Sequence, residues 1–155
     1  IEELRKLIRE VDGKHDRRWG ELVEILVEGS LAKIFKERGI IIKNTTLNLK
    51  SILITNGKRK EYEVDIVAEN RDCVIVVEAK TFLTSKHVSE FTKKLKFFKE
   101  AFPAYRNKGI YGAVAFLQVK KGVDKYAYRE GLFVIKVTSE NATILNDNKF
   151  VPKKW

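Results

Sequence analysis

The stretch from Glu61 to Lys80 most constrains how this chain can fold, because it encodes two β-strands joined by a short polar turn. In its first half, three apolar residues alternate with three acidic ones, which is the period-two pattern of a strand with two different faces. Residues 70–72, Asn-Arg-Asp, form the predicted turn. Residues 73–79 are apolar apart from Glu78, which indicates a central strand that is buried on both faces.

Charged side chains occur in this stretch where burial is expected. Glu78 and Lys80 are two residues apart, so both point to the same face of the second strand. Asp65 lies on the neighbouring strand and, in a hairpin centred on the turn, falls within reach of both. Two carboxylates and a lysine are therefore expected to converge at the edge of an apolar sheet. Burying such charges is unfavourable unless they pair with one another or bind a metal.

Two interpretations fit this convergence. One is a cross-strand salt bridge at the end of a sheet, which contributes little to stability. The other is a metal site, because Mg²⁺ is a hard cation that usually binds one or two carboxylates together with water and substrate phosphate. A lysine beside the carboxylates can hold a water molecule or neutralise developing charge. The pattern of the two strands favours the metal site.

The motif resembles that of a known enzyme superfamily. Asp65, followed thirteen residues later by Glu78-Ala79-Lys80, is similar to the signature of the PD-(D/E)XK nucleases, which include Holliday-junction resolvases and many restriction enzymes. Val64 stands where the motif has its proline, a position that is commonly relaxed in the superfamily. The resemblance implies that Asp65 and Glu78 bind Mg²⁺, with Mn²⁺ able to substitute, and that Lys80 positions the attacking water.

A further metal ligand is expected from the helix predicted over residues 19–38, which ends at a glycine. Glu21, Glu24 and Glu28 line one stripe of this helix, and an exposed, solvated stripe is one interpretation. Many PD-(D/E)XK nucleases take an extra ligand from a glutamate on the first core helix. The resemblance implies Glu24 in this role, with Glu28 as the second choice.

The charge of the chain indicates a polyanionic partner. Lysine and arginine number 31 against 21 acidic residues, so the formal net charge is +10, and nucleic acid is the first partner to consider. A basic helix is predicted to begin after Thr84 or Ser85. The residues expected to contact phosphates there are Lys86, Lys93, Lys94 and Lys96. An ordinary solvated helix face is at least as good an interpretation of each single lysine. His15 and His87 have no second ligand at metal-binding spacing and are interpreted as surface residues.

Smaller features locate the other elements. Residues 40–49 and 51–55 are predicted strands, and Asn56-Gly57 after them is a strong signal for a tight hairpin turn. The helix that follows Thr84 or Ser85 is expected to end before Pro103. Gly112, inside the strand predicted over 110–119, suggests a close approach to the backbone.

The predicted order of elements is helix, strands, helix, strand, helix, strand. It agrees with an α/β protein of the restriction-endonuclease-like fold, which has an αβββαβ core and a mixed sheet flanked by helices. Longer segments are also similar to an uncharacterised prokaryotic family with an N-terminal coiled coil and a C-terminal PD-(D/E)XK domain. These segments are Trp19-Gly20 with Glu24, Phe35–Ile40, Phe102–Tyr105, Tyr111–Ala115, Tyr126–Tyr128, Gly131–Val134 and Ile144–Trp155.

Residues 1–18 are expected to form an N-terminal helical extension, and residues 19–155 the nuclease-like domain. Apolar residues recur in the extension at heptad-like spacing. They fit the end of a coiled coil whose beginning has been trimmed, which would make a homo-oligomer such as a dimer. They fit equally well an amphipathic helix that packs on its own domain, so both interpretations remain open.

The sequence thus predicts a metal-dependent nuclease that hydrolyses phosphodiester bonds in nucleic acid, with DNA as the expected substrate. The alternative is a nucleic-acid-binding or oligomeric assembly module that keeps the fold without catalysis. No apolar run approaches the roughly 18 residues that a membrane helix needs, and no signal peptide is expected. A cytoplasmic protein without a membrane partner is expected. Abundant Lys, Glu and Ile, with no methionine, are typical of thermophiles.

Overall fold

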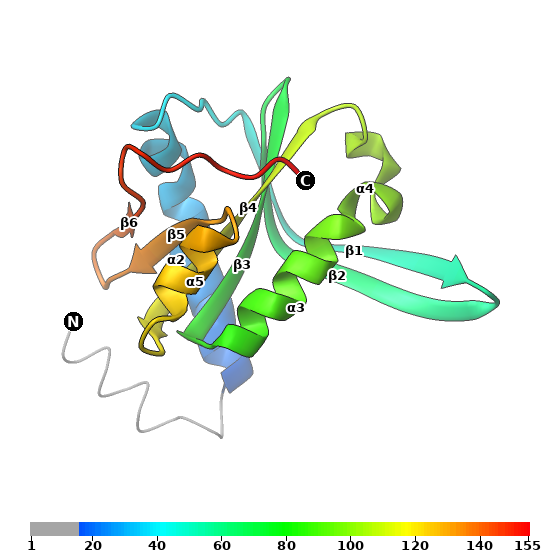
Figure 1. Ribbon diagram of the computed structural model, residues 1–155, viewed down its shortest axis with the longest axis horizontal. Coiled ribbons are helices and arrows are strands. Elements are labelled where there is room, and N and C mark those ends of the chain that lie inside the picture. The colour runs from blue at the N-terminus through cyan, green and yellow to red at the C-terminus, as the bar shows by residue number, and fades with distance from the viewer. Residues whose placement is uncertain (1–15) are drawn as a thin grey trace.

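The computed structural model describes residues 16–155, which fold around a six-stranded sheet (Figure 1). The strands are β1 (Asn44–Thr55), β2 (Lys58–Glu69), β3 (Cys73–Leu83), β4 (Gly109–Val119), β5 (Phe133–Val137) and β6 (Ala142–Ile144). The helices are α2 (Asp16–Lys36), α3 (Ser85–Lys96), α4 (Phe98–Ala101) and α5 (Val123–Arg129), with a short 3₁₀ turn at Pro103–Tyr105.

The strands lie in the sheet in the same order as in the chain, but their directions differ. β1, β2 and β3 form an antiparallel meander, β3, β4 and β5 run parallel, and β6 is antiparallel to β5. Parallel neighbours need a crossover connection, which α3 and α4 supply between β3 and β4, and α5 between β4 and β5. The order α2-β1-β2-β3-α3-β4 confirms the αβββαβ core and the mixed sheet flanked by helices.

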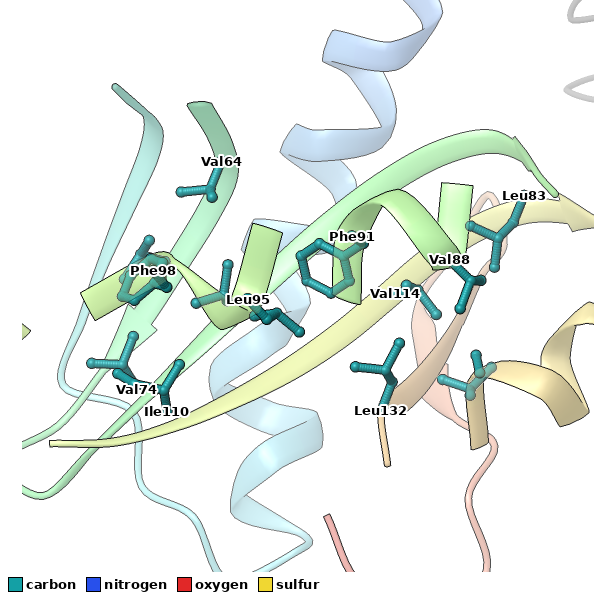
Figure 2. Close-up of a cluster of buried hydrophobic side chains, with 14 of the residues drawn as sticks. Val64, Val74, Leu83, Val88, Phe91, Leu95, Phe98, Ile110, Val114 and Leu132 are labelled. Carbon is teal, nitrogen blue, oxygen red and sulfur yellow. The ribbon is translucent and has the colours of Figure 1, made fainter. Parts of the chain in front are cut away.

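Helices cover both faces of the sheet. Figure 1 shows α2 behind the sheet and α3 and α5 in front of it. On the α2 side, the apolar stripe of that helix, which includes Val23, Val27 and Leu31, is fully buried. On the other side, Phe91, Leu95 and Phe98 pack over side chains of β3 and β4 (Figure 2). Each such side chain contributes about 1.5–3 kcal/mol through burial, so both layers hold the sheet in place.

β3 is the central strand that its sequence predicted, because residues 74–77 are completely buried. It is longer than expected, since it pairs with β4 as far as Leu83 opposite Val119. Glu78 and Lys80 therefore lie inside the strand rather than at its end. The close backbone approach expected at Gly112 of β4 is also present. A Cβ atom there would lie 2.5 Å from a methyl carbon of Leu95 and 2.8 Å from one of Leu132.

The ends of the helices differ from expectation in detail. α2 ends at Lys36, and Gly39, at φ 79°, takes the chain out of the helix. Thr84 caps α3 as predicted, but the helix expected to run on towards Pro103 breaks at Phe97 into α3 and α4. The coiled coil and the dimer predicted from the N-terminal extension depend on residues 1–15, which lie outside the described residues. From residue 16 onward, no helix is long and apolar enough to cross a membrane.

β1 and β2 extend beyond the rest of the sheet as a projecting hairpin (Figure 1). β2 pairs with β1 over its whole length but with β3 only from Ile66 to Glu69. We call the projecting part, residues 49–64, the arm. Its turn is the predicted one, because Asn56 and Gly57 both have positive φ, as a tight hairpin requires. The structure replaces the two segments expected at 40–49 and 51–55 with one strand, β1. This strand bends at Asn48, which has φ 53° and lies opposite Asp65 in the register.

The C-terminal segment is attached to the core by backbone contacts. The N–H of Lys153 donates to the carbonyl of Gly131 at 3.0 Å, and the N–H of Trp155 donates to that of Ile110 at 2.8 Å. Gly131 has φ 82°, and a Cβ atom on it would lie 3.0 Å from the backbone nitrogen of Lys153. Gly122 has a similar φ of 85° but has open space around it.

These two glycines predict different costs for the same substitution. Gly122→Ala should lower the free energy of unfolding by about 1–2 kcal/mol, the cost of placing an alanine in the left-handed region. Gly131→Ala should cost about 1–3 kcal/mol more, because the added methyl group collides with the backbone of the C-terminal segment. Urea unfolding of both variants measures the difference. Equal losses would show that the C-terminal segment is not held against Gly131.

Candidate active site

Asp65 lies at the point where β2 separates from β3. The last paired residues of the two strands are Ile66 and Val77. Just beyond them, the backbone N–H of Ala79 donates a hydrogen bond of 2.9 Å to Oδ2 of Asp65. The carboxylate thus takes the place that a backbone carbonyl would have if β2 had stayed in the ladder. This bond fixes the side chain of Asp65 against β3.

Glu78 comes from β3 and is only 7% exposed. Two lysines flank its carboxylate: Nζ of Lys94 lies 3.5 Å from Oε2, and Nζ of Lys80 lies 3.9 Å from Oε1. Burial and the neighbouring charge of Asp65 nevertheless raise the pKa of Glu78 from 4.5 to about 7, although both lysines act to lower it. The structure therefore brings Asp65, Glu78 and Lys80 together, as the hairpin register predicted.

Glu24 reaches the same place from α2. Burial, the charge of Asp65 and a hydrogen bond between the two carboxyl groups raise the pKa of Glu24 from 4.5 to about 7. Glu28 is one turn further along the helix, and its Oε1 accepts a hydrogen bond of 2.8 Å from Oγ1 of Thr45 on β1. Of the two glutamates predicted as alternatives, the structure places Glu24 beside Asp65 and directs Glu28 elsewhere.

Two hollows give access to these groups. A cleft of about 810 Å³ is lined by Glu24, Asp65, Lys80 and His87, among others. A smaller pocket of about 110 Å³ is lined by Glu78, Lys80, His87 and Lys94, among others. Lys80 and His87 line both hollows. They therefore lie between the cleft, which gives access to Asp65, and the smaller pocket, which gives access to Glu78.

His87 is a residue of this cleft that the sequence analysis missed. It occupies the first turn of α3, where its Nδ1 accepts a hydrogen bond of 3.1 Å from the N–H of Thr84. Partial burial and the positive charge of Lys80 lower the pKa of His87, which favours the neutral imidazole. Since Nδ1 is an acceptor, the proton of the neutral ring is on Nε2. The signal in the sequence was its place three residues after a capping threonine, directly after the motif strand.

The four lysines expected to contact nucleic acid do not lie on one common surface. Lys94 turns inward to Glu78, as described above. Lys86, Lys93 and Lys96 are exposed on α3, and Nζ of Lys86 lies 3.9 Å from Oε1 of Glu90. Exposed pairs of this kind are weak, so Lys86 remains available to a phosphate. The inward turn of Lys94 could not be read from the sequence, because it depends on how α3 packs on the sheet.

The carboxylates can be compared with what a divalent cation requires. Within residues 16–155, no three His, Cys, Asp or Glu side chains are arranged so that they could hold a metal ion as they stand. Asp65 instead contacts Glu24 and Glu78 in two separate pairs. The donors still fit Mg²⁺ or Mn²⁺ chemically, because Mg²⁺ prefers carboxylate oxygens and usually takes one or two of them with water. Burial, together with the charge of Asp65, raises the pKa values of Glu24 and Glu78, and for Glu78 it does so in spite of Lys94 and Lys80.

Comparison with known proteins identifies a family without an assigned function. Residues 30–144 match the model of a domain of unknown function, DUF8196, and the chain belongs to that family. A comparison with curated protein sequences finds no match. The resemblance to the PD-(D/E)XK nucleases stays a prediction from the sequence motif.

Two solved structures are similar to parts of this chain. One is a protein of unknown function, AF1548, with 19% sequence identity and a TM-score of 0.41 over 67% of this chain and 53% of that protein. The other is a repair endonuclease from Pyrococcus abyssi, with 22% identity and a TM-score of 0.41 over 71% of this chain and 46% of that protein. The chain thus spans about half the length of each.

The raised pKa values predict how stability depends on pH when no metal is present. Between about pH 5 and pH 8, the folded protein keeps protons on Glu24 and Glu78 that the unfolded chain has released, since their pKa values are about 7 when folded and 4.5 otherwise. The free energy of unfolding should therefore fall as the pH rises through this range. Urea unfolding in EDTA at several pH values measures it.

Asp65→Asn should flatten this pH dependence, because it removes the charge that repels both glutamates. Glu28→Gln is the control, since Glu28 contacts Thr45 rather than Asp65, and it should leave the pH dependence unchanged. A profile that is the same in wild type and Asp65→Asn would contradict the contacts described here.

Proposed function

We propose that this member of the DUF8196 family is a metal-dependent nuclease that hydrolyses phosphodiester bonds in nucleic acid, with DNA as the first substrate to test. The observation that carries the proposal is the position of Asp65, in contact with Glu24 from α2 and with Glu78 from β3 at the edge of an open cleft. Three ionised carboxylates from three elements repel one another unless protons or a cation join them.

Each group has a role in this proposal. Asp65, Glu78 and Glu24 would hold Mg²⁺ or Mn²⁺, which, when bound, makes a water molecule more acidic and stabilises charge at phosphorus. The ammonium group of Lys80, 3.9 Å from Glu78 and on the border of the cleft, orients the attacking water and stabilises negative charge in the transition state. His87 offers its Nε2–H as a hydrogen-bond donor to a phosphate oxygen in the same cleft.

A salt bridge that serves only stability explains the same residues less well. A structural ion pair balances its charges, whereas here the burial and mutual repulsion of the carboxylates outweigh two lysines and raise the pKa of Glu78 to about 7. Perturbed groups of this kind, together in a cleft, are typical of functional sites. The net charge of +10 further supports a polyanionic substrate, because it would attract nucleic acid to a site whose carboxylates repel phosphate.

A cleavage panel tests the proposal. Wild type should cut at least one of single-stranded, duplex or branched DNA, or RNA, in Mg²⁺ or Mn²⁺. Asp65→Ala and Lys80→Ala should each lose at least about 100-fold in rate, because the first removes a metal ligand and the second removes the positive charge that stabilises the reacting phosphate. Glu24→Gln should also lose activity. Glu28→Gln is its matched control on the same helix and should retain the rate of the wild type.

Thermal unfolding with and without metal separates the outcomes. Binding of Mg²⁺ or Mn²⁺ to the folded state raises the melting temperature of wild type by mass action, and Asp65→Ala should abolish this shift. A shift without cleavage would indicate a metal-binding module that keeps the fold without catalysis. The absence of both cleavage and a shift, in the full panel with both metals, would overturn the proposal.

Lys94 and Lys93 form a matched pair for a second prediction. Lys94 partly compensates Glu78, whereas its neighbour Lys93 is exposed. Lys94→Met should lower the cleavage rate about 10–100-fold, as loss of a residue that supports a metal ligand typically does, and leave affinity for nucleic acid in EDTA nearly unchanged. Lys93→Met should leave the rate at saturating substrate unchanged. Weaker binding in EDTA by Lys94→Met alone would instead make Lys94 a direct contact to nucleic acid.

A further inference from the structure

The arm, residues 49–64, is a feature that the proposed active site does not use. It is a two-stranded ribbon that projects past α3 and α4, away from the rest of the sheet (Figure 1). Beyond Ile66, β2 has no pairing with β3, so the arm has only its own two strands. Isolated hairpins are marginally stable in water. A long hairpin that is kept in a fixed position therefore needs a support.

The base of the arm has that support. Tyr62 and Val64 are buried in the core beneath α3 and α4, and Leu49 and Leu53 pack against the same core. The ring of Tyr62 meets that of Phe102 edge-on at a centroid distance of 5.6 Å. One face of the arm is thus fixed to the helical layer, and the outer end is held at a defined angle to the active site.

The outer end combines positive charge with exposed apolar surface. Lys58, Arg59 and Lys60 are consecutive and exposed. Ile54, which is directly opposite Arg59 in the register and shares its face, is 75% exposed. Arg59 lies 3.9 Å from Glu61, but both side chains are largely exposed, so this pair is weak and leaves the guanidinium available.

We propose that the outer end of the arm enters a groove of duplex nucleic acid whose backbone lies across the active-site cleft. The inference rests on the proposed function and specifies its substrate as double-stranded. A two-stranded β-ribbon has the right width for the major groove of B-DNA. Lys58, Arg59 and Lys60 contact phosphates and base edges, and Ile54 contacts the apolar parts of the bases.

The position of the arm along β2 supports a duplex rather than a single strand. Asp65 and Arg59 are six residues apart on one strand, which spans about 20 Å at about 3.3 Å per residue. The same length covers about six base pairs at about 3.4 Å per pair. Lys50 and Glu63 of the arm line the cleft together with Asp65, so the ribbon and the active site form one continuous surface. A flexible single strand presents no groove for the ribbon to enter.

The test compares two triple variants that remove the same charge from different places. The arm variant carries Lys58→Gln, Arg59→Gln and Lys60→Gln. The control variant carries Lys33→Gln, Lys36→Gln and Lys43→Gln, which are exposed residues at the end of α2 and just before β1, away from the arm. Binding of each to a 20-base-pair DNA duplex, and to one of its single strands, is measured by fluorescence anisotropy in EDTA over a range of salt concentrations, so that nothing is cut.

The arm variant should bind the duplex at least about tenfold more weakly and should reduce the slope of log K against log salt by about 2–3, since each lost phosphate contact removes about 0.9. The control variant should change both much less. Affinity of the arm variant for the single strand should fall by a smaller factor than its affinity for the duplex. Equal losses for the two DNA forms, or equal losses in the two variants, would overturn the proposal.

Two further results would also decide the question. A change in molecular mass by light scattering in the arm variant would overturn the proposal, because the arm would then contact a second copy of the chain. Cleavage that is lost in Lys80→Ala but unchanged on duplex in the arm variant, with unchanged binding, would leave the nuclease proposal in place and overturn the arm. Arm-dependent duplex binding by a chain that cuts nothing would support the role of the arm and overturn the nuclease proposal.

Discussion

The hydrogen bond from the N–H of Ala79 to Asp65 is the contact on which the candidate site depends, because it exists only where β2 leaves β3. In a continuous ladder that N–H would be bound to a backbone carbonyl, and the carboxylate would have no reason to be there. The bend at Asn48, whose φ is 53° and which lies opposite Asp65, marks the same place on β1. The separation of the strands therefore creates both the opening of the cleft and the position of its first carboxylate.

The rest of the sheet keeps β3 in place where β2 separates from it, so the cleft stays open. β3 continues past the separation because β4 pairs with it as far as Leu83, and fully buried side chains on both faces hold it in the sheet. Glu78 is consequently held in the sheet, almost fully buried, and cannot retreat to solvent. Its carboxylate can be stabilised there by Lys80 and Lys94, by a proton or by a cation. The pKa of about 7 means that, without a cation, a proton competes for this position near neutral pH.

The sequence predicted the fold and the meeting of Asp65, Glu78 and Lys80 because these depend on local patterns. Strand alternation, the Asn-Gly turn and the apolar run of β3 fix the register, and the register fixes which side chains are neighbours. The inward turn of Lys94, the placement of His87 and the choice between Glu24 and Glu28 depend on how whole helices pack on the sheet. Helical spacing alone does not determine which of several residues, one turn apart or on adjacent faces of a helix, points to the site. The roles of all these residues in binding or catalysis stay predictions.

The continuity of β2 has a mechanical consequence. One strand carries Asp65 at its middle and the basic end of the arm six residues away, and Tyr62 and Val64 between them are anchored in the core. A force on the arm is therefore transmitted to Asp65 along a braced strand rather than through a flexible loop. Contact between the arm and a duplex would fix the direction in which the backbone crosses the cleft, and would do so before any phosphate reaches the carboxylates. Since orientation of this kind supplies a large part of the rate enhancement in two-substrate steps, the arm would favour substrates that are long and double-stranded over short or single-stranded ones.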